Sequence, residues 1–207
     1  FIHADVNRVI LHGDLTQIES TLPGPLSKKT GTPLSLDASA TWRTGSTAWM
    51  LGLSLQPPRH TPLLTLTGVA TPKRLEMQVT SPDVLGKVNW TFPHQLQCTL
   101  SKLALSSQDF HQAPSTQSPN LHAWPNIQCS VTQFYWNQQL LGSLSLQLKQ
   151  QNGTLYVDPL SLQQGSDTVT LQGRIYPTPN ASTLTNQYYI NANSTNWGQL
   201  LASMGLK

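Results

Sequence analysis

Apolar and polar residues alternate along most of this chain. Successive side chains of a β-strand point to opposite faces, so a period of two predicts half-buried strands. Further runs at 96–100, 127–131, 155–162 and 186–192 bring the expected total to about a dozen strands, separated by turn signals such as QNG and RTGS. The apolar positions of the clearest runs are Leu34, Leu36, Ala38, Ala40 and Trp42; Trp49, Leu51, Leu53 and Leu55; Leu64 and Leu66; Leu75, Met77 and Val79; Leu144, Leu146 and Leu148; and Val169, Leu171 and Ile175.

The alternation gives each strand one apolar face and one polar face. Ser, Thr, Gln and Asn fill the polar positions, which is typical of an antiparallel sheet with one face in water. A second sheet, closure of the sheet on itself, a helix or an apolar ligand would each cover the other face. We therefore predict an all-β fold, an antiparallel meander twisted into a half-open, taco-like groove or a flattened barrel.

One segment departs from the period of two. In NWGQLLASMG, residues 196–205, Asn196 can cap a helix and Gly205 can end it. We expect a short helix here that covers the end of the apolar face, although a helix that closes an ordinary sandwich core would have the same sequence. Four apolar residues fall at i, i+3, i+4 and i+7, the spacing of one helical face: Trp197, Leu200, Leu201 and Met204.

Two stretches interrupt the meander. Residues 20–29 contain Pro23 and Pro25, which oppose helix and remove two backbone donors, so an extended loop is expected. Residues 106–125 contain three prolines and no periodicity, which predicts a long loop. All-β proteins reach this length as one unit, and residues 1–207 are therefore predicted to form a single module.

Composition narrows the classes of partner. Charged residues make up only 10% of the chain, and the 12 basic residues are scattered, so nucleic acid is not an expected partner. No apolar run approaches the roughly 18 residues of a membrane-spanning helix. Because the chain starts at Phe1, with neither a signal peptide nor a methionine, we expect it to belong to a longer protein whose membrane anchor lies outside it.

The two cysteines, Cys98 and Cys129, share the parity of their apolar neighbours. Antiparallel pairing of their two runs across the long loop would bring Cys98 opposite Cys129. A disulfide is one consequence. The alternative is two thiols on the apolar face, where free cysteine packs as a small hydrophobe.

Residues that could perform chemistry are few and dispersed. The chain contains nine acidic residues and six histidines, and no HxH, HExxH, CxxC, GxSxG, Walker or GxGxxG pattern occurs. We therefore expect no catalytic residues, no metal site and no cofactor, and we predict that the protein is not an enzyme. A pocket that brings two histidines to an aspartate would reopen this question.

The six tryptophans offer an alternative function. A flat, exposed row of them could stack on sugar rings, as in a carbohydrate-binding module, whereas buried ones would belong to the core of a structural β-sandwich. The parity of Trp42 and Trp49 favours the apolar face. The tryptophans are Trp42, Trp49, Trp90, Trp124, Trp136 and Trp197.

Several motifs, in their order along the chain, resemble one family. STLPGPLSKKTGTPLSL at 20–36 is followed by Trp124–Pro125, and then by an LG-x-L strand carried by Leu141, Gly142 and Leu144. VTLQGRIYP and a threonine-leucine strand at 183–184 precede the closing segment with its paired leucines. Together they are similar to the C-terminal region of the YhdP branch of the AsmA-like bacterial envelope proteins. This chain departs from the family pattern in two places. The family often has glycine at the position of Asn137, and it often has tryptophan where this chain has Arg174 and Ile175.

The resemblance implies a role in lipid transport. Such proteins resemble the bridge-like lipid transport proteins, in which a taco-shaped β-groove with an apolar interior carries phospholipid between the inner and outer membranes. It implies a periplasmic location, an inner-membrane anchor, phospholipid acyl chains as ligand, and other envelope proteins as candidate partners in outer-membrane homeostasis. The expected groove-lining residues are Leu34, Leu36, Leu53, Leu55, Leu64, Leu66, Leu144, Leu146, Leu148, Val169 and Leu171.

Overall fold

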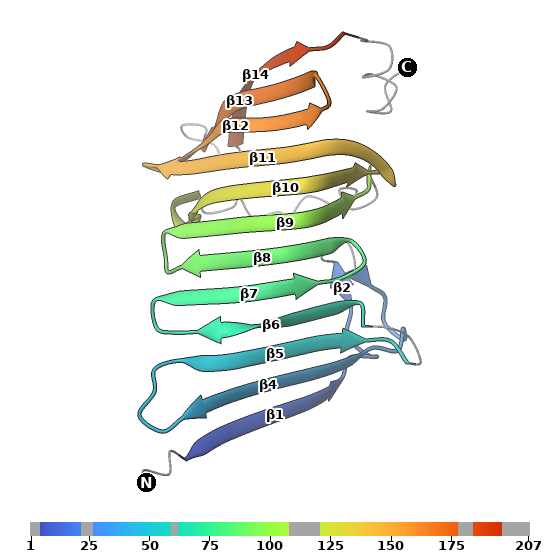
Figure 1. Ribbon diagram of the computed structural model, residues 1–207, viewed down its shortest axis with the longest axis vertical. Coiled ribbons are helices and arrows are strands. Elements are labelled where there is room, and N and C mark those ends of the chain that lie inside the picture. The colour runs from blue at the N-terminus through green and yellow to red at the C-terminus, as the bar shows by residue number, and fades with distance from the viewer. Residues whose placement is uncertain (1–4, 22–26, 59–61, 108–120, 178–183, 196–207) are drawn as a thin grey trace. The chain divides into compact units, whose positions relative to one another are not determined.

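The chain folds as β-strands joined by short turns (Figure 1). The computed structural model describes residues 5–21, 27–58, 62–107, 121–177 and 184–195. By its internal contacts it divides into two compact units, residues 1–93 and 94–207. The all-β class predicted from the alternation is confirmed, whereas the single-module boundary stays a prediction.

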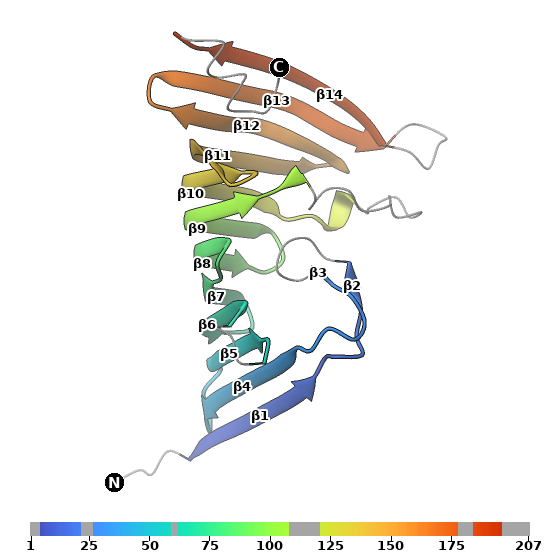
Figure 2. The same cartoon turned by 90° about the vertical axis from the view of Figure 1, so that its right-hand side faces the viewer.

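The first unit contains a sheet of antiparallel strands in the order β1-β4-β5-β6-β7-β8. The expected loop at 20–29 contributes two short strands, which pair with each other and stand apart from that sheet (Figure 2). The strands are β1 (Val6–Asp14), β2 (Ser20–Thr21), β3 (Ser27–Lys28), β4 (Ser35–Arg43), β5 (Trp49–Gln56), β6 (Leu64–Ala70), β7 (Arg74–Thr80) and β8 (Val84–Thr91).

The second unit contains a sheet in the order β9-β10-β11-β12-β13-β14. All of these pairs are antiparallel except β9 and β10. Its elements are β9 (Gln95–Leu105), the short 3-10 helix η3 (Leu121–Ala123), β10 (Asn126–Trp136), β11 (Gln139–Gln151), β12 (Thr154–Gln164), β13 (Asp167–Pro177) and β14 (Leu184–Asn193).

The described strands of neither unit close into a barrel within that unit. Among the described strands, β1 does not pair with β8, and β9 does not pair with β14. This agrees with the open form of the prediction and excludes a flattened barrel within either unit. The part of the chain that is described contains no helix long and apolar enough to span a membrane.

The register puts residues of one parity on one face, as the alternation predicts. Leu36 of β4 lies opposite Leu55 of β5, and Leu55 lies opposite Leu64 of β6. Tight turns hold this register. Asn137 and Gln138 both have positive φ between β10 and β11, which is the geometry of a type I′ hairpin turn. Asparagine at position 137 adopts this left-handed geometry more readily than most residues other than glycine.

The cysteine-bearing strands run parallel, which corrects the predicted antiparallel pairing. Leu96, Cys98 and Leu100 of β9 lie opposite Ile127, Cys129 and Val131 of β10. Both directions bring Cys98 beside Cys129, so residue parity could not distinguish them. The length of the 106–125 connection was the available signal, because a parallel pair needs a crossover of a dozen or more residues.

Two strands were missed at the sequence level. In β1 the consecutive apolar residues Val9, Ile10 and Leu11 break the alternation, and in β8 a glycine occupies an apolar-face position, Gly86 opposite Val79. The predicted helix at 196–204 lies outside the described residues. So does the central part of the long loop, residues 108–120.

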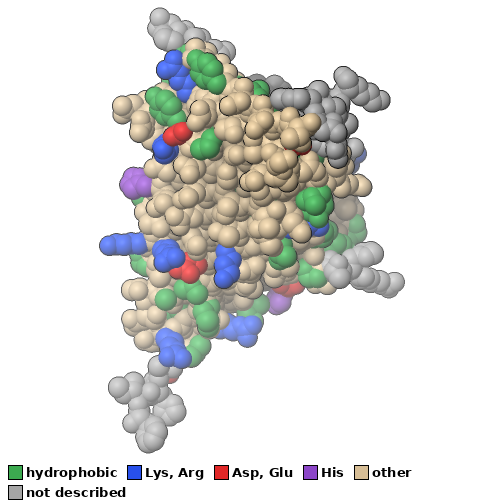
Figure 3. Space-filling view, turned by 45° about the horizontal axis from the view of Figure 1, so that its top comes forward, with side chains coloured by type: hydrophobic (Ala, Val, Ile, Leu, Met, Phe, Trp, Pro, Cys, Tyr) green, Lys and Arg blue, Asp and Glu red, His purple; other side chains and the backbone are tan. Residues whose placement is uncertain are grey.

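Burial is uneven between the two units. The first buries three apolar side chains among the residues described, Leu34, Leu55 and Val79. The second unit buries eight apolar side chains among its described residues. The face of the molecule seen in Figure 3 is covered mostly by neutral polar side chains and backbone. The buried residues of the second unit are Leu100, Leu121, Val131, Phe134, Leu141, Leu155, Val157 and Leu162.

Candidate functional site

The apolar face of the first unit carries a cavity of about 330 Å³. It extends from β1 to β7, and its walls are almost entirely apolar atoms. Val9 and Leu11 come from β1, and the register places them beside Ala40 and Ala38 of β4. The side chains that line it include Val9, Leu11, Ala40, Leu53, Leu66 and Met77.

The cavity is open at the β1 end. Val9 is 56% exposed and Leu11 is 57% exposed, although both lie on the apolar face. A packed interior would leave apolar side chains of this size nearly inaccessible. The cavity is therefore a hollow on a sheet surface.

The predicted groove residues of the first unit share this face. Leu53 lies opposite Leu66, and Leu36, Leu55 and Leu64 form one cross-strand row. Leu53 and Leu66 line the cavity. Leu34 and Leu55 are buried, whereas Leu36, Leu53, Leu64 and Leu66 are half-buried.

The predicted groove residues of the second unit also share one face. Leu144 and Leu146 lie opposite Leu162 and Leu160 of β12, which in turn lie opposite Val169 and Leu171 of β13. All five predicted positions are half-buried: Leu144, Leu146, Leu148, Val169 and Leu171. The other residues proposed from the sequence, Trp197, Leu200, Leu201 and Met204, lie outside the described part.

The rest of the cavity lining was missed. Val9 and Leu11 belong to the strand that was not recognised, and Met77 was assigned to a strand but not to the groove. Parity could not identify Val9 and Leu11, because Ile10 between them is also apolar.

Three tryptophans lie in one cross-strand row at the edge of the first unit's apolar face. Trp42 stacks on Trp49 with ring centroids 4.7 Å apart, and Trp90 lies in the same row. Trp49 is 43% exposed. Among the described side chains, the Nε1 of Trp90 is a buried donor with no hydrogen-bond partner. Such a row has an apolar body with a polar rim.

The two cysteines are neighbours and free in this structure. A hydrogen bond donated by the Cys129 thiol to Cys98 Sγ lowers the pKa of Cys98, against the opposing effect of burial. The same hydrogen bond, together with burial, raises the pKa of Cys129. Ionisation of one thiol is therefore favoured by the other, whereas ionisation of the second is opposed.

Titratable groups do not converge into a catalytic arrangement in the part of the chain described. His12 Nδ1 lies 2.5 Å from Asp37 Oδ1, but both side chains are widely exposed, and no second histidine among the described residues lines the pocket beside them. No group of three or more His, Cys, Asp or Glu residues that could hold a metal ion occurs among those residues. That the protein is not an enzyme stays a prediction.

Comparison with protein families, with curated proteins and with solved structures found no match for this chain.

Proposed function

We propose that this protein binds lipid acyl chains on the apolar face of its sheets. The observation that carries the proposal is the open cavity of about 330 Å³, whose walls are apolar and whose β1 end leaves Val9 and Leu11 more than half exposed. Apolar surface of this kind is stabilised by an apolar occupant. Each buried CH₂ of an acyl chain contributes about 0.8 kcal/mol and needs no specific polar partner.

The surrounding residues support an occupant with a polar end. The tryptophan row borders the same apolar face, and Trp49 leaves 43% of its surface exposed there. Indole rings favour the boundary between acyl chains and polar groups in membranes. A phospholipid supplies both an acyl chain and an ester, so it suits this face better than a plain hydrocarbon does.

The resemblance to the AsmA-like envelope proteins supplies the cellular context of the proposal. The protein would be a non-enzymatic, periplasmic part of a chain anchored in the inner membrane. Its apolar face would contribute to phospholipid transport between the inner and outer membranes, in contact with other envelope proteins.

The two alternative functions, carbohydrate binding by the tryptophans and a structural β-sandwich, have less support. Sugar stacking by tryptophans needs a flat row on a polar surface, whereas Trp42, Trp49 and Trp90 lie on the apolar face. A structural β-sandwich needs a second sheet over that face. Among the described residues only the short β2–β3 ribbon stands outside the main sheet of the first unit.

Site-specific photo-crosslinking tests the proposal. A photoreactive amino acid at position 53 faces the cavity, and one at position 54 faces the opposite side of the same strand. After expression in a bacterial envelope, we expect phospholipid to crosslink at Leu53 and not at Ser54. A probe at Leu146 examines the second unit in the same way.

A charge substitution complements the crosslink. Leu53→Lys should reduce the phospholipid that co-purifies with the protein, measured by lipid extraction and mass spectrometry, because it places an ammonium group against apolar walls. Ser54→Lys is the matched control and should leave co-purification unchanged. Equal crosslinking at positions 53 and 54, or no co-purifying lipid, would contradict the proposal.

A further inference from the structure

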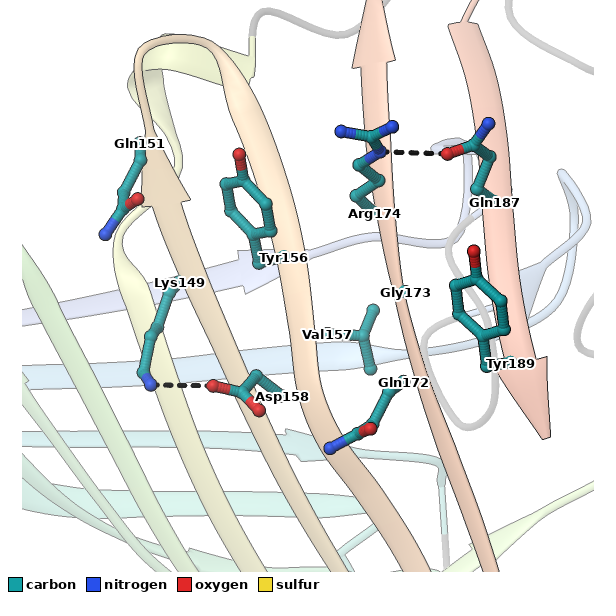
Figure 4. A pocket seen from close by; sticks show the side chains of 10 residues that line it. All are labelled: Lys149, Gln151, Tyr156, Val157, Asp158, Gln172, Gly173, Arg174, Gln187 and Tyr189. Atoms are coloured by element: carbon teal, nitrogen blue, oxygen red, sulfur yellow. Dashed lines mark hydrogen bonds and ion pairs between the residues drawn. The ribbon is translucent and has the colours of Figure 1, made fainter. Parts of the chain in front are cut away.

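The second unit has a polar pocket of about 450 Å³ on the face opposite its apolar side chains (Figure 4). Four neighbouring strands, β11 to β14, build it. Lys149, Tyr156, Arg174 and Gln187 lie opposite one another in one cross-strand row. Gln172 and Tyr189 form the next row. Adjacent strands thus bring charged, amide and aromatic groups to one surface.

Hydrogen bonds within the pocket leave a defined set of groups facing outward. Lys149 Nζ lies 2.8 Å from Asp158 Oδ2, so these charges neutralise each other. Arg174 Nε donates to Gln187 Oε1 at 3.0 Å. That contact orients the planar guanidinium and leaves its terminal nitrogens and the Gln187 amide nitrogen as donors. Within the described residues no carboxylate forms an ion pair with Arg174.

Two tyrosines flank this cation. Tyr156 on β12 and Tyr189 on β14 lie on either side of β13 and two residues apart along the strands, a separation of about 12 Å at ordinary strand spacing. Tyr189 is 76% exposed, which leaves most of its ring without a protein neighbour. An exposed ring with a hydroxyl at its tip offers a flat apolar surface and a polar handle.

We propose that this pocket binds an acidic saccharide, a short sugar chain that carries carboxylate groups. The Tyr189 ring stacks on the apolar face of one sugar ring, and Arg174 pairs with a carboxylate in bidentate geometry. Gln172, Gln187 and Asp158 contact hydroxyl groups, for which amides and carboxylates are ready partners. The spacing of the two tyrosines suits a chain of two or three sugars.

Other ligand classes match the pocket less well. An acyl chain would leave the donors of Arg174 and Gln187 unpaired on burial, at a cost in free energy. A simple anion would not use the tyrosine rings. Nucleic acid binding depends on many cations along a groove, and here one positive charge is in excess.

The test measures binding of three probes to the whole chain by NMR or calorimetry. Trigalacturonic acid carries sugar rings and carboxylates, its methyl ester keeps the rings and loses the charges, and inorganic phosphate has charge without rings. We expect saturable binding of trigalacturonic acid, with affinity for the methyl ester about tenfold weaker and no comparable binding of phosphate.

Variants assign the binding to these residues. Arg174→Gln should weaken trigalacturonic acid binding about tenfold and abolish its advantage over the methyl ester, while Tyr189→Ala should weaken both sugars. Lys102→Gln is the control for charge. Arg174 lies over the ring of Tyr176, and Lys102 lies in the same way over the ring of Tyr135, outside the pocket. Tyr188→Ala is the control for the aromatic ring, because Tyr188 is the adjacent residue on the opposite face. Neither control should change binding.

Each other outcome overturns the proposal. Equal binding of phosphate would mean an anion site only, and equal binding of the methyl ester would remove the role of Arg174. Loss of binding in the control variants would place the site elsewhere. Because Leu53→Lys acts on the apolar face of the other unit, it should leave trigalacturonic acid binding intact, and the lipid and saccharide proposals can fail separately.

Discussion

At the scale of single residues, the register gives equivalent positions different chemistry. Cys98 and Cys129 lie side by side on parallel strands, and both face the apolar side of the second unit. One thiol donates to the other, so their pKa values move in opposite directions. The two thiols meet because the parallel register of β9 and β10 places Cys98 directly opposite Cys129.

Cysteine alkylation tests this asymmetry. The thiolate is the reactive form, and the pKa of Cys98 lies below its ordinary value, so Cys98 should react with iodoacetamide at lower pH than Cys129. Cys129→Ala removes the donor, which raises the pKa of Cys98 and moves its alkylation midpoint to higher pH. Peptide mass spectrometry over a neutral-to-alkaline pH series measures both midpoints.

Cys129→Ser retains a hydroxyl donor and should give an intermediate midpoint. If Cys98 titrates identically in the wild type and in both variants, the hydrogen bond between the two thiols does not exist in solution. Mild oxidation provides a second measurement. Neighbouring strands bring Cα atoms within disulfide range, so an intramolecular disulfide should form between Cys98 and Cys129.

Gly142 occupies a position where the fold leaves no room for a side chain. Its φ is +107°, and an added Cβ would lie 2.0 Å from the backbone oxygen of Gln163 on β12. Gly142→Ala should therefore lower the free energy of unfolding by about 2 kcal/mol or more, measured by urea denaturation.

The matched control for this substitution is Gly165→Ala. Gly165 also has positive φ, +60°, but nothing lies within 4 Å of its added Cβ, so only backbone strain of about 1 kcal/mol is expected. Equal losses in the two variants would mean that β11 and β12 do not approach as closely as the structure has them.

At the scale of elements, the crossover between β9 and β10 distinguishes the second unit from a meander. Its described end, η3, lies against β11 and β12. Leu121 is 6% exposed there, and the His122 ring lies next to Gly153 in the β11–β12 turn. The connection is therefore anchored to the strands that contain much of the buried core.

Shortening the buried Leu121 side chain of η3 should destabilise the second unit. Leu121→Ala should lower the free energy of unfolding by about 2 to 4 kcal/mol, because it removes a buried side chain that the surroundings cannot easily replace. Trp124→Ala, three residues away at a position 41% exposed, should cost clearly less despite its larger volume. A greater loss at Trp124 in urea denaturation would contradict the assigned anchor.

At the scale of the whole molecule, burial predicts which parts of the chain are most stable. Among the described residues, eight of the eleven buried apolar side chains belong to the second unit. Hydrogen exchange measured by mass spectrometry should therefore be slower in β10–β12 than in β4–β6, because opening of a segment costs more where more apolar contacts are lost.

Added phospholipid should slow exchange in β4–β6 if it occupies the cavity there, since a ligand that binds the folded state raises the free energy of opening. Leu53→Lys should abolish that effect. Equal protection of the two sets of strands without lipid would show that the half-buried face is stabilised by something other than the side chains described.

Most of the fold was predictable from local patterns, because strand parity is a property of consecutive residues. The runs around Leu36, Leu53 and Leu146 identified their strands and their apolar faces, and turn signals such as Asn152–Gly153 marked the hairpins. β1 was not predictable in this way, because Val9, Ile10 and Leu11 are consecutive and give no parity. Part of the cavity lining was therefore missing from the sequence-based site.

The sequence by itself determined which residues of each strand face the same side, since a side-chain period of two needs no information from distant residues. The tertiary structure alone decided that β9 and β10 are parallel, that β1 pairs with β4, and that Lys149, Tyr156, Arg174 and Gln187 meet on one surface. The reason is physical. Backbone hydrogen bonds between strands are the same for any residue pair, so the choice of neighbour and direction depends on connection length and on packing across the whole sheet.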